Sequence, residues 1–164
     1  MKKFIALLMA LSTLFLFSAC QMRPIEIEQL KDGYQKFVEN LGHSQLTDSK
    51  DLIGKRTSIA DEYTGSYEAS CTRSTSGRDV IFGGASLKSR EVHVRGTLQR
   101  ESGKATVRIR MNGKVEELPI DQDGSFEVDC HMESGGNYIM VVYDSFQGSV
   151  QLVSEYDTVV KKEG

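Results

Sequence analysis

The chain has no tryptophan, only two prolines and only three cysteines among its 164 residues. Without tryptophan it lacks the side chain with the largest aromatic surface for stacking on a flat ligand such as a sugar ring. No apolar run after residue 20 approaches the roughly 20 residues that a membrane-spanning helix needs. The formal net charge is −3, so the chain lacks the basic excess that attracts nucleic acid, and we expect no nucleic-acid partner.

Motifs for catalysis are also missing. The three histidines, His43, His93 and His131, do not have the spacing of metal ligands. No serine stands in a nucleophile elbow, and no glycine-rich segment ends in the Gly-Lys-Ser/Thr of a phosphate-binding loop. We therefore expect that the protein is not an enzyme and that it uses no metal and no cofactor. An envelope enzyme of unknown reaction, with His93 or His131 in its site, is kept as an alternative.

The N-terminus has the layout of a secretory signal peptide. Lys2 and Lys3 precede an almost wholly apolar stretch over residues 4–17, and two small residues follow. This stretch is too short to span a bilayer as a stable helix. The sequence therefore predicts that residues 1–19 are a signal peptide that is removed.

The segment "LFSAC", which ends at Cys20, resembles the lipobox of bacterial lipoproteins. This resemblance implies cleavage after Ala19 and attachment of lipid, with acyl chains such as palmitate, to the thiol of Cys20. Phe17 stands where the family usually has leucine, but it keeps a large apolar side chain. Buried acyl chains contribute about 0.8 kcal/mol per methylene, which anchors a protein to a membrane surface. The alternative is an ordinary signal peptide with an incidental cysteine.

The periodicity of apolar residues divides the rest of the chain. We expect a lipidated tether over 20–24, a helical segment over 25–60, a β-sandwich domain over 61–157 and a flexible tail over 158–164. In the helical segment, apolar residues recur at three- and four-residue spacing up to Gly42 and form one stripe: Ile27, Leu30, Tyr34, Phe37, Val38 and Leu41. We expect this stripe to dock on the main domain, and Thr47 to cap a short second helix that ends at Gly54.

From Glu62 onward the apolar period becomes two. Val92 and Val94 alternate with polar residues, as do Val107 and Ile109, and "Asn112-Gly113" is a strong signal for a two-residue hairpin turn. Turn residues recur every 8–12 positions. This spacing predicts an all-β fold, an antiparallel β-sandwich or small barrel of about eight strands.

Cys71 and Cys130 both fall on the inward phase of their predicted strands. In an exported chain such a pair favours a disulfide, here one that ties two layers through the core. The alternative is two buried free thiols.

A row of outward basic residues is a candidate ligand face. His93 and Arg95 lie on one predicted strand and Arg108 and Arg110 on the next, where they could grip a carboxylate or a phosphate. Acidic residues on neighbouring predicted strands supply the alternative, which is ordinary cross-strand ion pairing.

The segments "MESGGNYIM" and "VRIRMNGKVEELP" are faintly similar to the lysozyme-inhibiting lipoproteins of bacterial envelopes. Those proteins carry Ser-Gly-x-x-Tyr on an inhibitory loop, and Ser134, Gly135 and Tyr138 match it. Asn137 departs from the basic residue that usually precedes the tyrosine. A turn followed by a strand that starts in tyrosine explains the same letters.

Together these patterns predict a lipid-anchored, extracytoplasmic lipoprotein with a non-catalytic binding or structural role at the cell envelope. Its partners would be the membrane, through the anchor on Cys20, and an envelope protein or glycan. Inhibition of a lysozyme is the alternative binding function.

Overall fold

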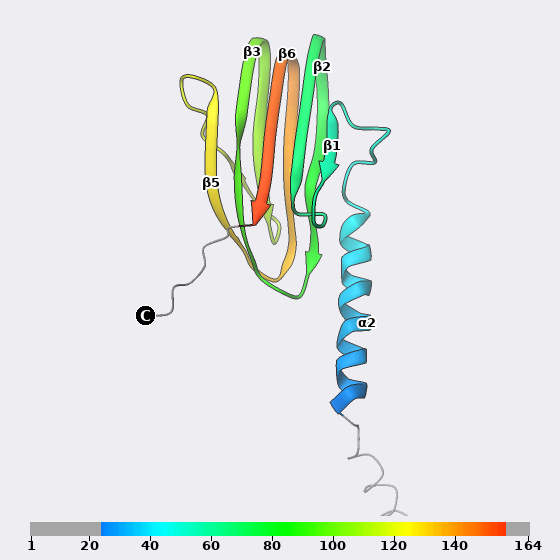
Figure 1. Cartoon of the computed structure of the whole chain (residues 1–164). Coiled ribbons are helices and arrows are strands. Elements are labelled where there is room, and N and C mark those ends of the chain that lie inside the picture. Colours follow the sequence, from blue (N-terminus) through cyan, green and yellow to red (C-terminus); the bar gives the residue numbers. More distant parts are fainter. Residues whose placement is uncertain (1–23, 157–164) are drawn as a thin grey trace, which may run out of the picture. The chain divides into compact units, whose positions relative to one another are not determined.

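The computed structural model describes residues 24–156. Among these residues one helix precedes six strands (Figure 1). The elements are α2 (Pro24–His43), β1 (Lys55–Ser58), β2 (Gly65–Ser86), β3 (Arg90–Met111), β4 (Lys114–Glu117), β5 (Ser125–Met132) and β6 (Gly135–Tyr156). The predicted signal peptide, the lipid site at Cys20 and the predicted tail over 158–164 lie outside the described residues.

Two compact units divide the chain after Lys36, within α2, and the second unit contains all the strands. The helix itself agrees with the predicted one, and Pro24 suits a first helical position because its missing N–H would be unsatisfied there anyway. The side chains of Tyr34, Phe37 and Leu41 are exposed, so these members of the predicted docking stripe are not packed. No helix in residues 24–156 is long and apolar enough to cross a membrane.

The predicted second helix after Thr47 is absent. The carbonyl of Asp48 accepts hydrogen bonds from the backbone N–H groups of Asp51 and Leu52, which closes a single turn. Thr47 does not cap a helix, because its hydroxyl accepts a hydrogen bond from the N–H of Val80 at 2.9 Å. The segment is thus attached to β2 instead of forming a helix of its own.

The six strands form one antiparallel sheet in the order β1-β2-β6-β3-β4, and β5 pairs with the first part of β3. The central strand β6 pairs with β2 along one edge and with β3 along the other. The hairpin at Asn112-Gly113 is present between β3 and β4, and both residues have the positive φ angles of a type I′ turn.

The sheet folds over on itself. Tyr67 and Asp79 lie twelve residues apart on β2, which would separate them by about 40 Å in a straight strand. Their side chains are nevertheless hydrogen bonded at 2.5 Å. The pairing register is irregular after Cys71 in β2 and after Arg100 in β3, where the long strands bend. Figure 1 shows the resulting two layers, with the nearer one drawn more strongly.

We call the two parts of the sheet the first and the second layer. The first layer holds β1, β5 and residues 65–71 of β2, 90–100 of β3 and 148–156 of β6; the second holds β4 and residues 77–86, 104–111 and 135–143 of the same long strands. Both layers bury their inward side chains in one apolar cluster, with Val94 and Leu152 from the first layer and Val107 and Val141 from the second.

The expected number of strands was wrong, since the described residues form six strands and not eight, and no closed barrel is formed. The polar stretch "TRSTSGRD" has the composition of a loop, but it lies inside β2. The stretch "SFQG" has the composition of a turn, but it lies inside β6. Both stretches fall where the sheet folds over, so their turn-like composition reflects a bend in a continuous strand.

The predicted disulfide is also absent, because Cys71 and Cys130 are both free. Both are buried, as their inward phase predicted, but they lie at opposite ends of the first layer. Cys71 is level with Arg100 of β3, through Gly148 of β6, whereas Cys130 pairs with Val92. Eight residues of β3 span about 26 Å, and a disulfide needs Cα atoms within about 7 Å.

A buried polar network joins the two layers. The carboxylate of Asp79, which is 1% exposed, accepts hydrogen bonds from the hydroxyl of Tyr67 and from the N–H groups of Ile53 and Gly54. The hydroxyls of Tyr67 and Tyr143 lie 2.7 Å apart. Burial raises the pKa of both tyrosines, so both hydroxyls keep their protons. The network holds the segment before β1 against the core.

Candidate functional site

The four residues of the predicted ligand face do not share a surface. All four lie on β3, with His93 and Arg95 in the first layer and Arg108 and Arg110 in the second. Because both layers bury their inward side chains in one core, their outward side chains point in opposite directions. The fold-over of β3 therefore separates two pairs that the sequence placed together.

Each arginine of this set already has a partner. Arg95 Nη2 lies 3.3 Å from Glu155 Oε1, and Arg108 Nε donates to Glu117 Oε1 at 3.0 Å. Arg110 donates to the side chain of Gln45, and its guanidinium lies 4.4 Å from the centroid of the Tyr138 ring. The contacts of Arg95 and Arg108 are cross-strand ion pairs, whereas Arg110 contacts an amide and an aromatic ring.

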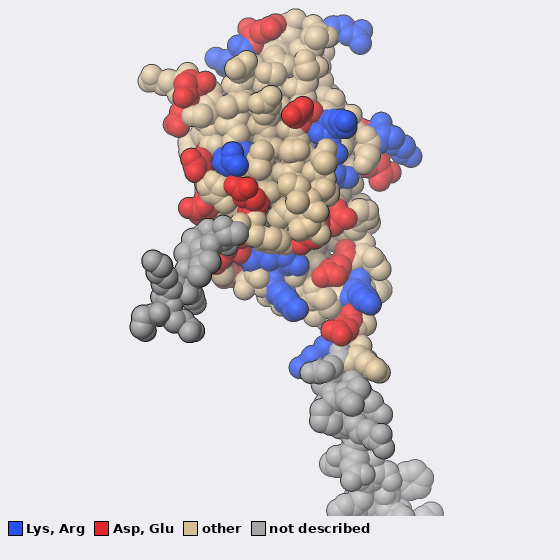
Figure 2. Space-filling model, viewed as in Figure 1, with Lys and Arg blue, Asp and Glu red and all other residues tan. Residues whose placement is uncertain are grey.

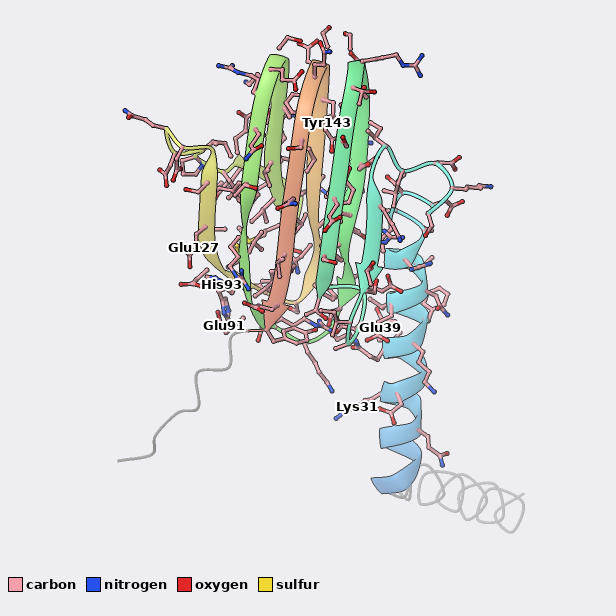
Figure 3. The ribbon with its side chains drawn as sticks, turned by 45° about the horizontal axis from the view of Figure 1, so that its top comes forward. Lys31, Glu39, Glu91, His93, Glu127 and Tyr143 are labelled. Carbon is pink, nitrogen blue, oxygen red and sulfur yellow. The ribbon has the colours of Figure 1, made fainter. Side chains whose placement is uncertain are left out.

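His93 lies between two carboxylates on the outer face of the first layer, as Figure 3 shows for Glu127. Its Nδ1 is 2.6 Å from Asp129 Oδ1, and its Nε2 is 3.1 Å from Glu127 Oε1. The hydrogen bond with Asp129 is the main cause that raises the pKa of His93 above the ordinary 6.5; burial opposes it, and the neighbouring negative charges add to it. In the protonated imidazolium form, both ring nitrogens donate hydrogen bonds. His93, Asp129 and Glu127 then form a three-residue ion-pair group.

This arrangement predicts a specific pH dependence. The folded-state pKa of His93 is raised, so its contribution to the free energy of unfolding is complete below the ordinary histidine value of about 6.5 and is lost as the pH rises through the higher native value. We expect NMR titration to give a higher pKa for His93 than for a free histidine, and Asp129→Asn to lower it. The exposed Asp144→Asn should leave it unchanged. An ordinary His93 pKa in the unsubstituted protein would contradict the predicted ion-pair group.

Among the residues of the predicted inhibitory loop, Tyr138 is buried, whereas Ser134 is exposed and Gly135 is half-buried. Tyr138 is 1% exposed, and its hydroxyl donates to the carbonyl of Gly42 at 3.2 Å. The carbonyl of Ser134 accepts a hydrogen bond from the side chain of Asn112, and Gly135 begins β6. The segment is a turn braced by the β3–β4 hairpin, and the tyrosine ring belongs to the packed interior.

A hollow lies where β3 bends between the layers, and we call it the bend hollow. Its volume is about 620 Å³, within the range of small-molecule sites. It is lined by Leu98, Gln99, Arg100, Lys104, Ala105, Ile120, Asp121, Gln122, Asp123 and Gly124. One wall comes from the bend of β3, and the other comes from the segment between β4 and β5.

A tight turn holds the second wall in place. The N–H of Asp121 donates to the carbonyl of Ser125 at 2.8 Å, and the N–H of Gly124 donates to the carbonyl of Asp121 at 3.0 Å. Gly124 has a φ of +87°, and a side chain there would collide with the carbonyl of Leu98. The N–H of Leu98 donates to the carbonyl of Gly124, so the turn is pinned to β3 at the edge of the hollow.

One aspartate of this wall, Asp123, is held as a carboxylate by hydrogen bonds. Asp123 Oδ1 accepts hydrogen bonds from the hydroxyl of Ser125 at 2.7 Å and from its N–H at 3.0 Å. These bonds, chiefly that from the hydroxyl, lower the pKa of Asp123. No group of three histidine, cysteine or acidic side chains within residues 24–156 is arranged to hold a metal ion.

The polar side chains of the β3 wall are free, and so is that of Gln122 on the second wall. The side chains of Gln99, Arg100, Lys104 and Gln122 make no hydrogen bond and no ion pair with any residue between 24 and 156. A second hollow of about 340 Å³ continues along β3 and shares Asp121 with the first; Arg95, Thr97, Glu127 and Gln151 are among its lining residues. Figure 2 shows positive and negative side chains interspersed over the face of the protein that is in view.

The sequence did not point to the bend hollow. Neither Arg100 nor Lys104 was among the predicted site residues. Two cations within five residues were the available signal, but nothing local indicated that the segment before Ser125 would face them.

Neither a family model nor a curated protein matches the chain. Among solved structures, the chain is similar in fold to the CBM35 of Abf62 from Cellvibrio japonicus, with 11% identity, 70% of this chain and 91% of that chain covered, and a TM-score of 0.38. A carbohydrate-binding module of Cellvibrio mixtus lichenase 5A, solved with cellotriose, has 7% identity, covers 70% and 94%, and gives 0.31. The pre-peptidase C-terminal domain of a Bacillus anthracis collagenase has 14% identity, covers 63% and 86%, and gives 0.35.

Proposed function

We propose that this protein is a non-catalytic binding domain of the cell envelope, and that it takes a glycan in the bend hollow. The observation that carries the proposal is the set of free polar side chains that line this hollow, Gln99, Arg100 and Lys104 from the β3 wall and Gln122 from the second wall. The basic side chains that the sequence suggested as a ligand face already have hydrogen-bond or ion-pair partners. The four side chains of the hollow, in contrast, offer donors and acceptors to a ligand.

A glycan suits the chemistry of the hollow. Sugar hydroxyls both donate and accept hydrogen bonds, so they match amides and carboxylates at once. Leu98, Ala105 and Ile120 add apolar surface to the lining, against which the C–H groups of a sugar ring can lie.

Binding without turnover is supported by the state of the acids. A general acid needs a carboxyl group whose pKa is raised toward neutrality. The pKa of Asp123 is lowered instead, because Ser125 hydrogen bonds to the charged form. The turn thus favours Asp123 as a hydrogen-bond acceptor over a proton donor.

The envelope location is proposed from the sequence. A signal peptide over residues 1–19 and a lipobox at Cys20 would place the rest of the chain outside the cytosol, on a lipid anchor. The protein would then present the bend hollow to glycans at the membrane surface.

The test uses the full-length protein in detergent micelles and a set of cell-wall and envelope oligosaccharides. We expect that immobilised protein retains at least one of them and that no new reducing ends are released during long incubation. Steady release of cleavage products would make the protein an enzyme and contradict the proposal, as would failure to retain any sugar.

A further inference from the structure

We infer that the glycan bound in the bend hollow is acidic, with a carboxylate beside free hydroxyls on the same sugar unit. This inference rests on the proposed function and names the class of ligand for the same hollow. It follows from the charges on the two walls, which have opposite signs and different hydrogen-bonding states.

The β3 wall, which carries Arg100 and Lys104, favours an anionic ligand group. Arg100 and Lys104 are exposed, line the hollow and have no partner within residues 24–156. Many other arginines in the described part of the chain are occupied: Arg56, Arg90, Arg95, Arg108 and Arg110 each hold a carbonyl, a hydroxyl, an amide oxygen or a carboxylate. A guanidinium presents a planar fork that matches a carboxylate, and an ammonium adds a point charge.

The acidic wall excludes a simple anion. Asp121 and Asp123 offer oxygens that only accept hydrogen bonds. A phosphate ion at neutral pH carries between one and two negative charges and has few hydroxyl groups that can donate a hydrogen bond. It therefore pairs with Arg100 and Lys104 but is repelled by Asp121 and Asp123. A sugar hydroxyl, in contrast, donates to a carboxylate.

A neutral sugar matches the acidic wall but not the cationic one. Its hydroxyls satisfy Asp121 and Asp123, but Arg100 and Lys104 then lose water without gaining a counter-charge. A sugar unit that carries both a carboxylate and hydroxyls satisfies both walls. The amides of Gln99 and Gln122 can donate or accept and therefore complete either contact.

The experiment compares two ligands that share one sugar backbone and differ in whether the carboxylate is free or masked as its methyl ester. Binding of oligogalacturonate and of its methyl ester to the full-length protein in detergent micelles is measured by calorimetry, with inorganic phosphate as a third probe. Hydrogen bonds to charged groups contribute about 1.5–3 kcal/mol, so we expect the acid to bind at least about tenfold more tightly than the ester. Phosphate should not compete at millimolar concentration.

Matched variants locate the effect. Arg100→Gln with Lys104→Gln should bring the affinity for the acid down to that for the ester. Lys55→Gln with Lys88→Gln removes the same charge from exposed positions outside the hollow and should change little. Independently of any variant, added salt should weaken binding of the acid and leave binding of the ester nearly unchanged.

The outcomes separate this inference from the proposed function. Equal affinity for acid and ester, or loss of the preference in the control variant, overturns the inference while the glycan-binding function stands. Tight binding of phosphate at the same residues also overturns it, because the acidic wall would then be irrelevant. If none of the oligosaccharides tested binds, the proposed function fails as well.

Discussion

Replacement of Cys20 by serine is expected to abolish lipid attachment completely. The thiol is the only group at that position that can take up the lipid, since the hydroxyl of serine is a much weaker nucleophile. Because cleavage before Cys20 follows lipidation in the resemblance to bacterial lipoproteins, the variant should also keep residues 1–19. The measurement is metabolic labelling with a palmitate analogue together with the intact mass of the purified protein.

Cys71→Ser is the matched control, because it removes a thiol that is buried in β2. It should still be labelled and processed as the unsubstituted protein is. Label that persists in the Cys20→Ser variant, or an unsubstituted protein that retains residues 1–19 without lipid, would overturn the proposed anchor and the envelope location with it.

Asp79→Ala should cause the largest loss of stability among single substitutions of polar residues in the described chain. The carboxylate is 1% exposed and accepts hydrogen bonds from Ile53, Gly54 and Tyr67. Its removal leaves three donors with no partner and opens a space between the layers. Each unsatisfied buried donor costs about 1–3 kcal/mol, so after partial access of water we expect a loss of about 3–5 kcal/mol in the free energy of unfolding.

Urea unfolding followed by far-ultraviolet circular dichroism measures this loss. Asp144→Ala serves as the control, since Asp144 is exposed on β6, and surface substitutions usually change stability by less than about 0.5 kcal/mol. A similar, small effect of both substitutions would show that the network of Asp79 does not join the layers.

Local patterns in the sequence predicted the alternation of the strands well. Val92, Val94, Val107 and Ile109 are buried as the period of two indicated, because the pleat alone decides which side chains share a face. The turn at Asn112-Gly113 was equally predictable, since a positive φ at two successive positions favours these two residue types.

The path of the long strands was not predictable in the same way. Whether a polar stretch such as residues 72–79 ends a strand or bends it depends on pairing with β6, which lies more than 60 residues further on. Gly103, with a φ of +69°, marks the bend in β3, but the same residue type also ends strands in ordinary turns.

Errors about the candidate site and the disulfide have this common cause. Arg95 and Arg108 were placed on two neighbouring strands, and Cys71 and Cys130 on facing layers. The fold-over puts the two arginines on opposite outer faces and the two cysteines at opposite ends of the first layer. Residue phase was right in each case, whereas position along the strand required the register.

The measurement that tests the central claim most directly is hydrogen–deuterium exchange of the full-length protein with and without bound oligogalacturonate. The account predicts slowed exchange in the peptides that line the bend hollow, over residues 98–105 and 118–125, and little change over residues 77–86, 106–111 and 135–143 of the second layer. Protection confined to other parts of the sheet, such as the strands around His93 and Tyr138, would contradict a binding site at the bend of β3.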